Sequence, residues 1–296
     1  MNTQNVYILE DRGILYINGV NAREFLQNII SNDINRVNEN NSCFASLLSP
    51  QGKFQFAFII IKHKSGYFID CEKSQVEELF KQLNIYKLRS KVEIMNLSNE
   101  FVVAAFNRDK FLKFEGAKDV PGNTIRYRED SILLDPRNKD LGARLIINLE
   151  KLYLSLKKLE LNDSPINEYY QLSHELGIAQ KEMNKLQNKL FGIECNYEEL
   201  NGIDFKKGCY VGQENTARIK LKNKLSKRLL PIKLLSGKLT EGASIYTNGI
   251  EIGKVLINDD YPFALIKYLN DHFIKGTQFN CINAKLKIKI PDWIKE

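Results

Sequence analysis

The spacing of apolar residues in the first third of the chain predicts six strands and two helices. Two short apolar runs, at residues 6–9 and 14–17, are separated by Glu10-Asp11-Arg12-Gly13, which is typical of a hairpin. Asn21 stands where a helix would begin, and Glu24 three residues later completes a capping-box pattern. Apolar residues at helical spacing give this helix one buried face, formed by Ala22, Phe25, Leu26, Ile29 and Ile30.

The rest of this region is predicted to form four strands and a second helix. The strands lie at residues 43–48, 53–62, 67–71 and 91–95. A turn between the first two of them is indicated by Ser49-Pro50-Gln51-Gly52. The second helix has its buried face at Val76, Leu79, Phe80 and Leu83.

A second α/β unit is predicted to start at residues 101–106. Strands near 132–135 and 143–148 lead into a helix at 150–161, and residues 165–177 also have a helical pattern. Both units combine several strands with one or two helices, although no sequence repeat is visible. The pattern therefore indicates two α+β halves that are built alike.

After Lys224 the pattern changes to short β-like runs separated by glycines. The runs lie at residues 229–234, 244–246, 252–258, 263–268 and 280–290. Such spacing is typical of a small antiparallel barrel or sandwich. We therefore divide the chain into units at residues 1–96, 97–224 and 225–296, and we expect the last unit to be docked because no low-complexity linker precedes it.

Composition narrows the possible classes of protein. The 296 residues carry a formal net charge of +7, which favours anionic ligands without specifying one. No apolar run approaches the ~18–20 residues of a membrane span, and the first residues lack the features of a signal or transit peptide. The five cysteines are scattered without C-x-x-C spacing, which argues against a disulfide framework and a self-contained zinc site. A reducing cytoplasm is the predicted compartment.

The segment DFKKGCYVGQE, residues 204–214, holds the candidate chemistry. Gly208 and Gly212 flank Cys209 and Tyr210-Val211, and glycines allow close backbone approach and φ values that other residues resist. Lys206 and Lys207 would favour the thiolate of Cys209, the form that attacks or binds metal. The alternative is a buried cysteine that packs as a small hydrophobic residue.

Residues Lys207 to Glu214 match in full the K-G-C-[FY]-x-G-Q-E signature of the folate-binding YgfZ family, whose members are relatives of the glycine-cleavage T-protein, an aminomethyltransferase. The chain also resembles this family in four segments that stand in the expected order, at residues 18–27, 49–53, 86–92 and 135–142. The resemblance therefore runs from about residue 13 to the end of the signature, and the C-terminal unit matches only by pattern.

This resemblance implies an α+β fold of two α/β, ferredoxin-like units and a C-terminal antiparallel β-barrel around a central channel that binds a reduced folate such as tetrahydrofolate. Family members assist the assembly or repair of iron–sulfur proteins, especially [4Fe–4S] enzymes, and affect tRNA modification through them. The family's functional residues correspond to Cys209 and Lys207. The resemblance to mitochondrial relatives implies that the cysteine is a cluster ligand shared with an A-type carrier. Three roles stay open for Cys209: cluster ligand, redox thiol or lining of the folate site.

The resemblance also implies a folate site around the signature. The expected cofactor-binding residues are Gly208, Tyr210, Gly212, Gln213, Glu214, Arg218 and Arg89. For Arg89 the alternative is an ion pair with an acidic residue at a domain interface. Cations at 218, 220, 222 and 224 alternate with apolar residues, which predicts an extended strand with one cationic face, running on to residue 228. That face is interpreted as a protected sheet edge, a cradle for the glutamate tail of folate, or a contact with RNA phosphates.

Two other functions compete with iron–sulfur protein assembly. One is a tetrahydrofolate-dependent aminomethyltransferase, although the N-terminal acid used by such enzymes has no recognisable counterpart here. The other is a module that binds tRNA directly through its cations, but no aromatic residues interleave them. We therefore expect an accessory protein rather than an enzyme.

Overall fold

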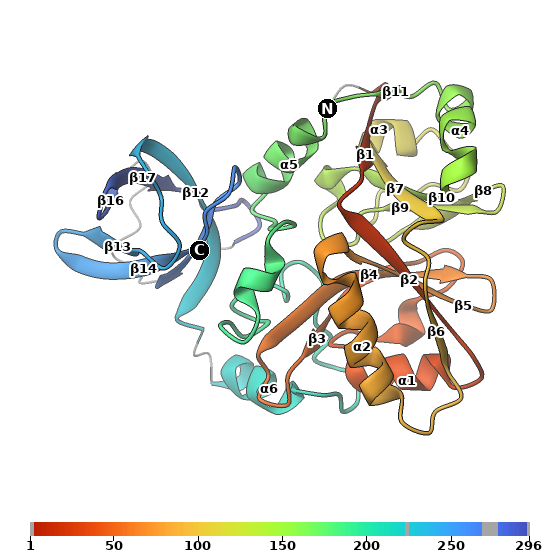
Figure 1. Cartoon of the computed structure of the whole chain (residues 1–296), viewed down its shortest axis with the longest axis horizontal. Coiled ribbons are helices and arrows are strands. Elements are labelled where there is room, and N and C mark those ends of the chain that lie inside the picture. The colour runs from red at the N-terminus through yellow and green to blue at the C-terminus, as the bar shows by residue number, and fades with distance from the viewer. Residues whose placement is uncertain (1–2, 223–224, 268–277, 295–296) are drawn as a thin grey trace.

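The computed structural model describes residues 3–222, 225–267 and 278–294. It contains a five-stranded sheet, a six-stranded sheet and a closed six-stranded barrel. In Figure 1 the two sheets lie together on one side, and the barrel forms a separate lobe on the other side of helix α5 (Ile166–Glu175). This arrangement confirms the predicted α+β fold with a C-terminal barrel.

The five-stranded sheet is antiparallel, with the order β3-β4-β5-β2-β6. Its strands are β2 (Arg12–Asn18), β3 (Cys43–Leu48), β4 (Phe54–His63), β5 (Gly66–Glu72) and β6 (Glu93–Asn96). Helices α1 (Ala22–Ile29) and α2 (Val76–Lys87) bury their apolar faces against it in one core cluster. The apolar residues of the sequence predicted all these elements. The two helices bury one regular face, whereas β3 and β5 are buried along their whole length and β6 is mostly exposed.

The second sheet has the order β11-β1-β7-β10-β9-β8. Its strands are β1 (Asn5–Leu9), β7 (Phe101–Phe106), β8 (Thr124–Tyr127), β9 (Asp130–Leu134), β10 (Ala143–Asn148) and β11 (Asn162–Asp163). Helices α3 (Arg108–Phe111) and α4 (Leu152–Lys158) accompany it. Short 3₁₀ helices are η1 (Ile34–Arg36), η2 (Lys73–Gln75), η3 (Lys139–Leu141), η4 (Leu149–Lys151) and η5 (Met183–Leu186).

The predicted hairpin between β1 and β2 is wrong. β1 pairs with β7 and β11, whereas β2 pairs with β5 and β6 in the other sheet. The turn residues between the two strands change the direction of the chain, but they do not determine which strands pair. The partners are decided by long-range burial, because both strands are almost entirely buried and each needs hydrogen bonds on two sides.

The predicted capping box at the start of α1 is also wrong. Asn21 is the N-cap residue, but its side chain makes no capping hydrogen bond. Its Oδ1 instead accepts a hydrogen bond of 3.0 Å from the backbone N–H of Lys91. This bond ties the start of α1 to the segment that leads into β6.

The C-terminal unit is a closed antiparallel barrel with the order β12-β15-β14-β13-β16-β17. Its strands are β12 (Lys227–Gly237), β13 (Ser244–Thr247), β14 (Ile250–Ile257), β15 (Phe263–Lys267), β16 (Phe279–Cys281) and β17 (Ala284–Ile288). Tyr268, predicted as the end of a strand, lies outside the described residues, as do Asn223 and Lys224.

The barrel is docked through the segment around α5. Trp293 Nε1 donates a hydrogen bond of 2.7 Å to the carbonyl oxygen of Leu176, and His174 Nε2 lies 2.9 Å from that of Pro262. One apolar core cluster contains residues of both sheets and of the barrel, among them Leu229 and Phe263. The unit boundaries near residues 96 and 224 stay a prediction.

Candidate functional site

Cys209 lies on the loop of residues 204–212, immediately before helix α6 (Gln213–Leu221). All five cysteines are in the described part of the chain, and Cys209 is the exposed one. Burial raises the pKa of Cys43 and of Cys71 to about 12, so these thiols stay protonated. The alternative of a packed, buried Cys209 is therefore wrong, and this thiol is open to a partner or reagent.

Lys207 points into the protein rather than along the exposed loop. Its Nζ donates hydrogen bonds to the carbonyl oxygens of Gln27 at 2.7 Å, Ile30 at 2.7 Å and Asn32 at 2.9 Å. These carbonyls lie at and just beyond the C-terminal end of α1, where helical carbonyls need donors and favour a cation. The ammonium also lies 4.8 Å from the ring centre of Tyr210.

Burial lowers the pKa of Lys207 to about 8, although Asp33, Cys43 and Asp204 oppose the shift. The geometry differs from the expectation that this ammonium supports the thiolate of Cys209, because its three hydrogen bonds are made to α1 and the residues after it. Lys206, by contrast, is exposed. Lys207 thus holds the loop in place.

Further bonds fix the loop on both sides of Cys209. The backbone N–H of Asp204 donates to the carbonyl oxygen of Ser31 at 3.0 Å, and that of Val211 donates to the carbonyl oxygen of Asn28 at 3.2 Å. The Asp204 carboxylate forms an ion pair of 2.5 Å with Arg36. The loop that exposes Cys209 is therefore bound to the end of α1 at two backbone positions.

Of the two glycines beside Cys209, Gly212 is the constrained one. Its φ is +81°, and a Cβ there would lie 2.4 Å from the carbonyl oxygen of Ser49. Gly52 also has a positive φ, +79°, and a Cβ there would lie 3.0 Å from the Gly212 carbonyl oxygen. A Cβ on Gly208 would meet open space, so the expectation of a special conformation does not hold there. Two distant sequence segments thus meet at a glycine contact.

Cys209 lines a hollow with a volume of about 850 Å³. The other lining residues come from the turn after β3, the end of α2, the loop and α6: Pro50, Tyr86, Tyr210, Val211, Gly212, Gln213, Glu214, Ala217, Arg218, Leu221 and Lys222. Five of the predicted cofactor-binding residues are therefore brought together around the cysteine. Gly208 is not among the lining residues.

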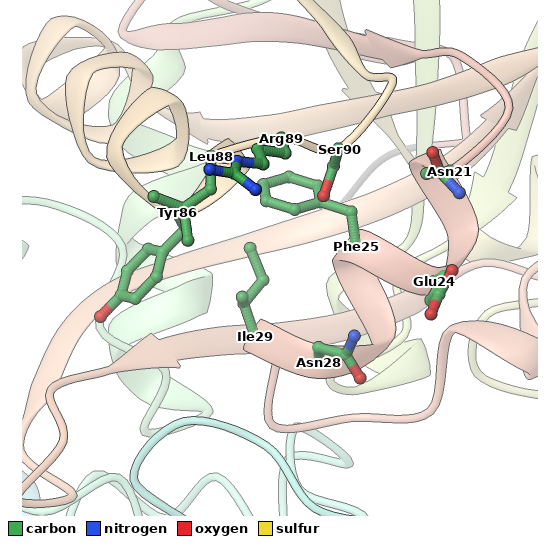
Figure 2. Close-up of a pocket in the computed structure, with 9 residues that line it drawn as sticks. All are labelled: Asn21, Glu24, Phe25, Asn28, Ile29, Tyr86, Leu88, Arg89 and Ser90. Carbon is green, nitrogen blue, oxygen red and sulfur yellow. The ribbon is translucent and has the colours of Figure 1, made fainter.

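Arg89 lines a second hollow of about 750 Å³ between α1 and the end of α2. Figure 2 shows Arg89 and Phe25 among its lining residues, with Tyr86 at the opposite side of the hollow from Glu24. Tyr86 lines both hollows, so the predicted Arg89 site adjoins the Cys209 site without being part of it.

The predicted cationic strand is wrong for residues 218–221, which belong to helix α6, whereas Lys227 and Arg228 at its far end do lie in a strand, β12. An alternation over so few residues does not distinguish a strand from a helix, and the turn at Gly212 starts the helix. Arg218 donates a hydrogen bond of 2.6 Å to Asn215, and Lys220 forms an ion pair with Glu198. Arg218 and Lys220 thus have separate partners on a helix, so these two cations do not form the strand face that the edge, cradle and RNA interpretations assumed.

Sequence reasoning missed the apolar surroundings of Cys209. Leu221 in the same hollow and Leu88 in the neighbouring one are each 86% exposed. Leu88 also has a φ of +45°, which is unusual for a residue with a branched side chain. Leucines are usually found in a core, so the residue type alone did not indicate that these two are exposed.

The described residues contain no group of three or more His, Cys, Asp or Glu side chains placed to hold a metal ion. Cys209 is therefore a single soft donor without further protein ligands around it. In the described part of the chain no helix is both long and apolar enough to cross a membrane.

Comparisons with known proteins show which proteins the chain is similar to. No family model matches it. The "Iron-sulfur cluster assembly factor IBA57 homolog, mitochondrial" of Dictyostelium discoideum is 30% identical over 271 residues, covering 82% of this chain and 65% of that protein. The protein of the same name from Neurospora crassa is 30% identical over 233 residues, with coverages of 75% and 52%. The chain thus spans 52–65% of the length of these two relatives.

A solved structure shows the same fold. Glycine cleavage system aminomethyltransferase T from Bartonella henselae superposes with a TM-score of 0.75 at 14% identity, covering 99% of this chain and 87% of that one. The predicted relationship is confirmed: the chain is homologous to iron–sulfur cluster assembly factors and has the fold of the glycine-cleavage aminomethyltransferase.

The predicted cytoplasmic location is wrong by the same comparison, because the matched relatives are named as mitochondrial proteins. The prediction relied on unpaired cysteines, which exclude oxidising compartments. They do not distinguish the cytosol from the mitochondrion, so the physical argument was too coarse for the conclusion.

Proposed function

We propose that this homologue of the iron–sulfur cluster assembly factors takes part in assembling or repairing [4Fe–4S] proteins, with Cys209 supplying one ligand to a cluster that a partner also binds. The observation that carries this proposal is the exposure of Cys209 at the edge of a hollow, without other metal-binding side chains around it. An iron–sulfur cluster commonly needs four ligands, so the remaining ones must come from another protein.

The surroundings of Cys209 suit such a shared ligand. Thiolate is the soft donor that iron–sulfur clusters select. The loop is fixed by Lys207 and by Gly212, so the thiol is presented in a defined position rather than on a mobile tail. Exposed Leu221 next to it would be covered when a partner docks, which would exclude water from the cluster.

An A-type iron–sulfur carrier is the proposed partner, and [4Fe–4S] enzymes are the proposed clients. The cluster is cargo here rather than a resident cofactor. An influence on tRNA modification would follow indirectly, through client enzymes. Direct binding of tRNA is not part of this proposal, because Arg218 and Lys220 lie on helix α6 rather than along one cationic strand face.

A reduced folate such as tetrahydrofolate is the second part of the proposal. The hollow at Cys209 has the volume of a ligand site, and Tyr86 and Tyr210 give it aromatic walls. Arg218 would bind a folate carboxylate, and Gln213 and Glu214 offer hydrogen-bonding groups, so the residues fit the group. Bound folate would supply one-carbon chemistry in an enzyme; in this proposal it only occupies the site.

Likeness to an aminomethyltransferase does not by itself carry that activity, because one fold hosts many functions. Titration calorimetry with tetrahydrofolate tests the folate site, and Arg218→Gln should weaken binding roughly tenfold if the guanidinium binds a carboxylate. Arg228→Gln is the control, because Arg228 is paired with Glu199 at 2.7 Å at the start of the barrel. Equal affinities of both variants would remove Arg218 from the site.

Anaerobic reconstitution with an A-type carrier tests the shared cluster. Visible absorption of the cluster should appear with the unsubstituted chain and carrier together, and Cys209→Ser should lower it to the level of the carrier alone. Cys281→Ala is the matched control, since that thiol is buried in the barrel. If Cys209→Ser retains the full spectrum of the complex, Cys209 is not a cluster ligand.

A further inference from the structure

A small cavity lies against the five-stranded sheet, apart from the Cys209 hollow. Its polar lining residues are Arg12, Glu72, Gln75, Arg137, Gln180 and Tyr197. Its volume is about 20 Å³, which accommodates a water molecule but no larger ligand. The remaining lining side chains are apolar or aromatic, so any polar group in this cavity depends on the few partners that the wall offers.

Two polar groups on these side chains have no hydrogen-bond partner among the described residues. They are the Nε2 group of Gln75 and the hydroxyl of Tyr197, which belong to residues that are 2% and 3% exposed. Gln75 ends η2 on the five-stranded sheet, and Tyr197 lies in the segment that leads to the Cys209 loop. Buried polar groups are almost always hydrogen-bonded, so two orphans on one cavity need an explanation.

The other polar groups of the wall already have partners. Arg137 binds the carboxylate of Asp135 at 2.7 Å and Gln180 Oε1 at 2.8 Å. The Glu72 carboxylate accepts the backbone N–H groups of Glu182 at 2.9 Å and Met183 at 3.0 Å. These groups are fixed, so they do not turn to satisfy Gln75 or Tyr197.

The Tyr197 ring is fixed as well. It meets Phe44 and Phe54 edge-on, with ring centres 5.1 Å and 5.8 Å away. Burial raises the pKa of Tyr197 well above its usual value, so the hydroxyl keeps its proton and can donate a hydrogen bond. The Tyr197 hydroxyl therefore needs a hydrogen-bond partner other than the side chains of the wall.

We propose that this cavity binds one ordered water molecule, held by Gln75 and Tyr197. Water both donates and accepts, so it serves the Tyr197 hydroxyl and either orientation of the Gln75 amide. The guanidinium groups of Arg12 and Arg137 in the wall disfavour a metal cation. The water links η2 to the segment of residues 192–203, which is attached to the end of α1 through the bond of 2.6 Å from Ser31 Oγ to the Gly202 carbonyl oxygen.

Thermal melting of three variants tests this water site. Tyr197→Phe and Gln75→Met keep the shape of each side chain and remove its polar group. Each should lower the melting temperature by about 2 °C or more, because a water-mediated bond is lost. The double variant should lose less than the sum, since both groups hold the same water. Tyr153→Phe is the control, because Tyr153 is 70% exposed and its substitution should leave the melting temperature unchanged.

A dry cavity predicts the opposite sign. Removing an unsatisfied buried polar group would then raise the melting temperature or leave it unchanged, and the two effects would add. A crystal structure of the unsubstituted chain, grown with bromide, decides the case independently of variant folding. A water peak within hydrogen-bond distance of both groups supports the proposal, whereas an anomalous bromide peak or an empty cavity overturns it.

Discussion

The ammonium nitrogen of Lys207 lies 2.7 Å from the backbone carbonyl oxygen of Ile30, the residue that ends helix α1. This bond joins the cysteine loop to a helix on the first sheet. The bond explains the role of a lysine two residues before Cys209 in structural terms. The lysine holds the loop that presents the thiol, and its ammonium group interacts with the carbonyl oxygens at the end of α1.

Substitution of Lys207 should therefore destabilise the fold. Lys207→Met keeps most of the side-chain length and leaves three carbonyls without their donor. The free energy of unfolding should fall by about 2–3 kcal/mol. This value already allows for the fact that the variant no longer has to bury a cation. Urea denaturation measures it. Lys206→Met is the matched control, since Lys206 is exposed and should change stability by less than about 0.5 kcal/mol. Equal effects at both lysines would contradict the anchoring role.

The two glycines of the signature should differ sharply. Gly212→Ala forces a side chain into positive φ and against the Ser49 carbonyl oxygen, so the expected cost is about 2–4 kcal/mol. Gly208→Ala places its methyl group in open space and should change stability by less than about 0.5 kcal/mol. Melting of both variants under the same conditions makes the comparison. A harmless Gly212→Ala would mean that the tight contact with residue 49 is absent in solution.

Thiol labelling should be selective for one position. In the native protein, iodoacetamide should modify Cys209 and leave the buried cysteines at positions 43, 71, 195 and 281 unmodified. Peptide mass spectrometry identifies the site, and labelling in urea shows that all five thiols can react. Cys209→Ser should abolish native labelling without lowering the melting temperature, because the side chain is exposed. Rapid native labelling of Cys71 would instead indicate opening of the first sheet.

Acid should weaken the fold through His63. Burial, followed by the nearby cations Lys64 and Arg126, lowers the pKa of His63 to about 4 from its usual 6.5. Between these pH values the unfolded chain binds a proton that the folded chain does not. Stability is therefore complete above pH 6.5 and falls as the pH drops towards 4. The full shift corresponds to about 3 kcal/mol, and solvent screening reduces the expected loss to about 1–2 kcal/mol.

His63→Phe is the variant for this measurement. A phenyl ring would keep the stacking on Phe68, whose ring centre lies 4.0 Å from that of His63. The difference in unfolding free energy between variant and unsubstituted chain should grow as the pH falls from 6.5 to 4. Parallel pH profiles of the two proteins would assign the acid sensitivity to other groups.

The sequence by itself determined the regular elements and the chemical centre. Strands β3, β4, β5 and β7 follow from runs of apolar residues, most of which are buried, and the buried faces of α1 and α2 follow from apolar residues at helical spacing. The glycine spacing after residue 225 indicated the barrel. The signature from Lys207 to Glu214 identified Cys209, because a full eight-residue match is specific.

Tertiary structure decided the partners of these elements and the use of each side chain. β1 does not form the predicted hairpin but lies in the second sheet. There its two edges form hydrogen bonds with β7 and β11, which are distant in sequence. Helix α6 begins after Gly212, whose positive φ lies where it packs against Ser49 from another part of the chain. Lys207 turned to the end of α1 because three carbonyls there lacked a donor. Such contacts join residues far apart in sequence. A local sequence pattern contains no information about which distant group a given residue will contact.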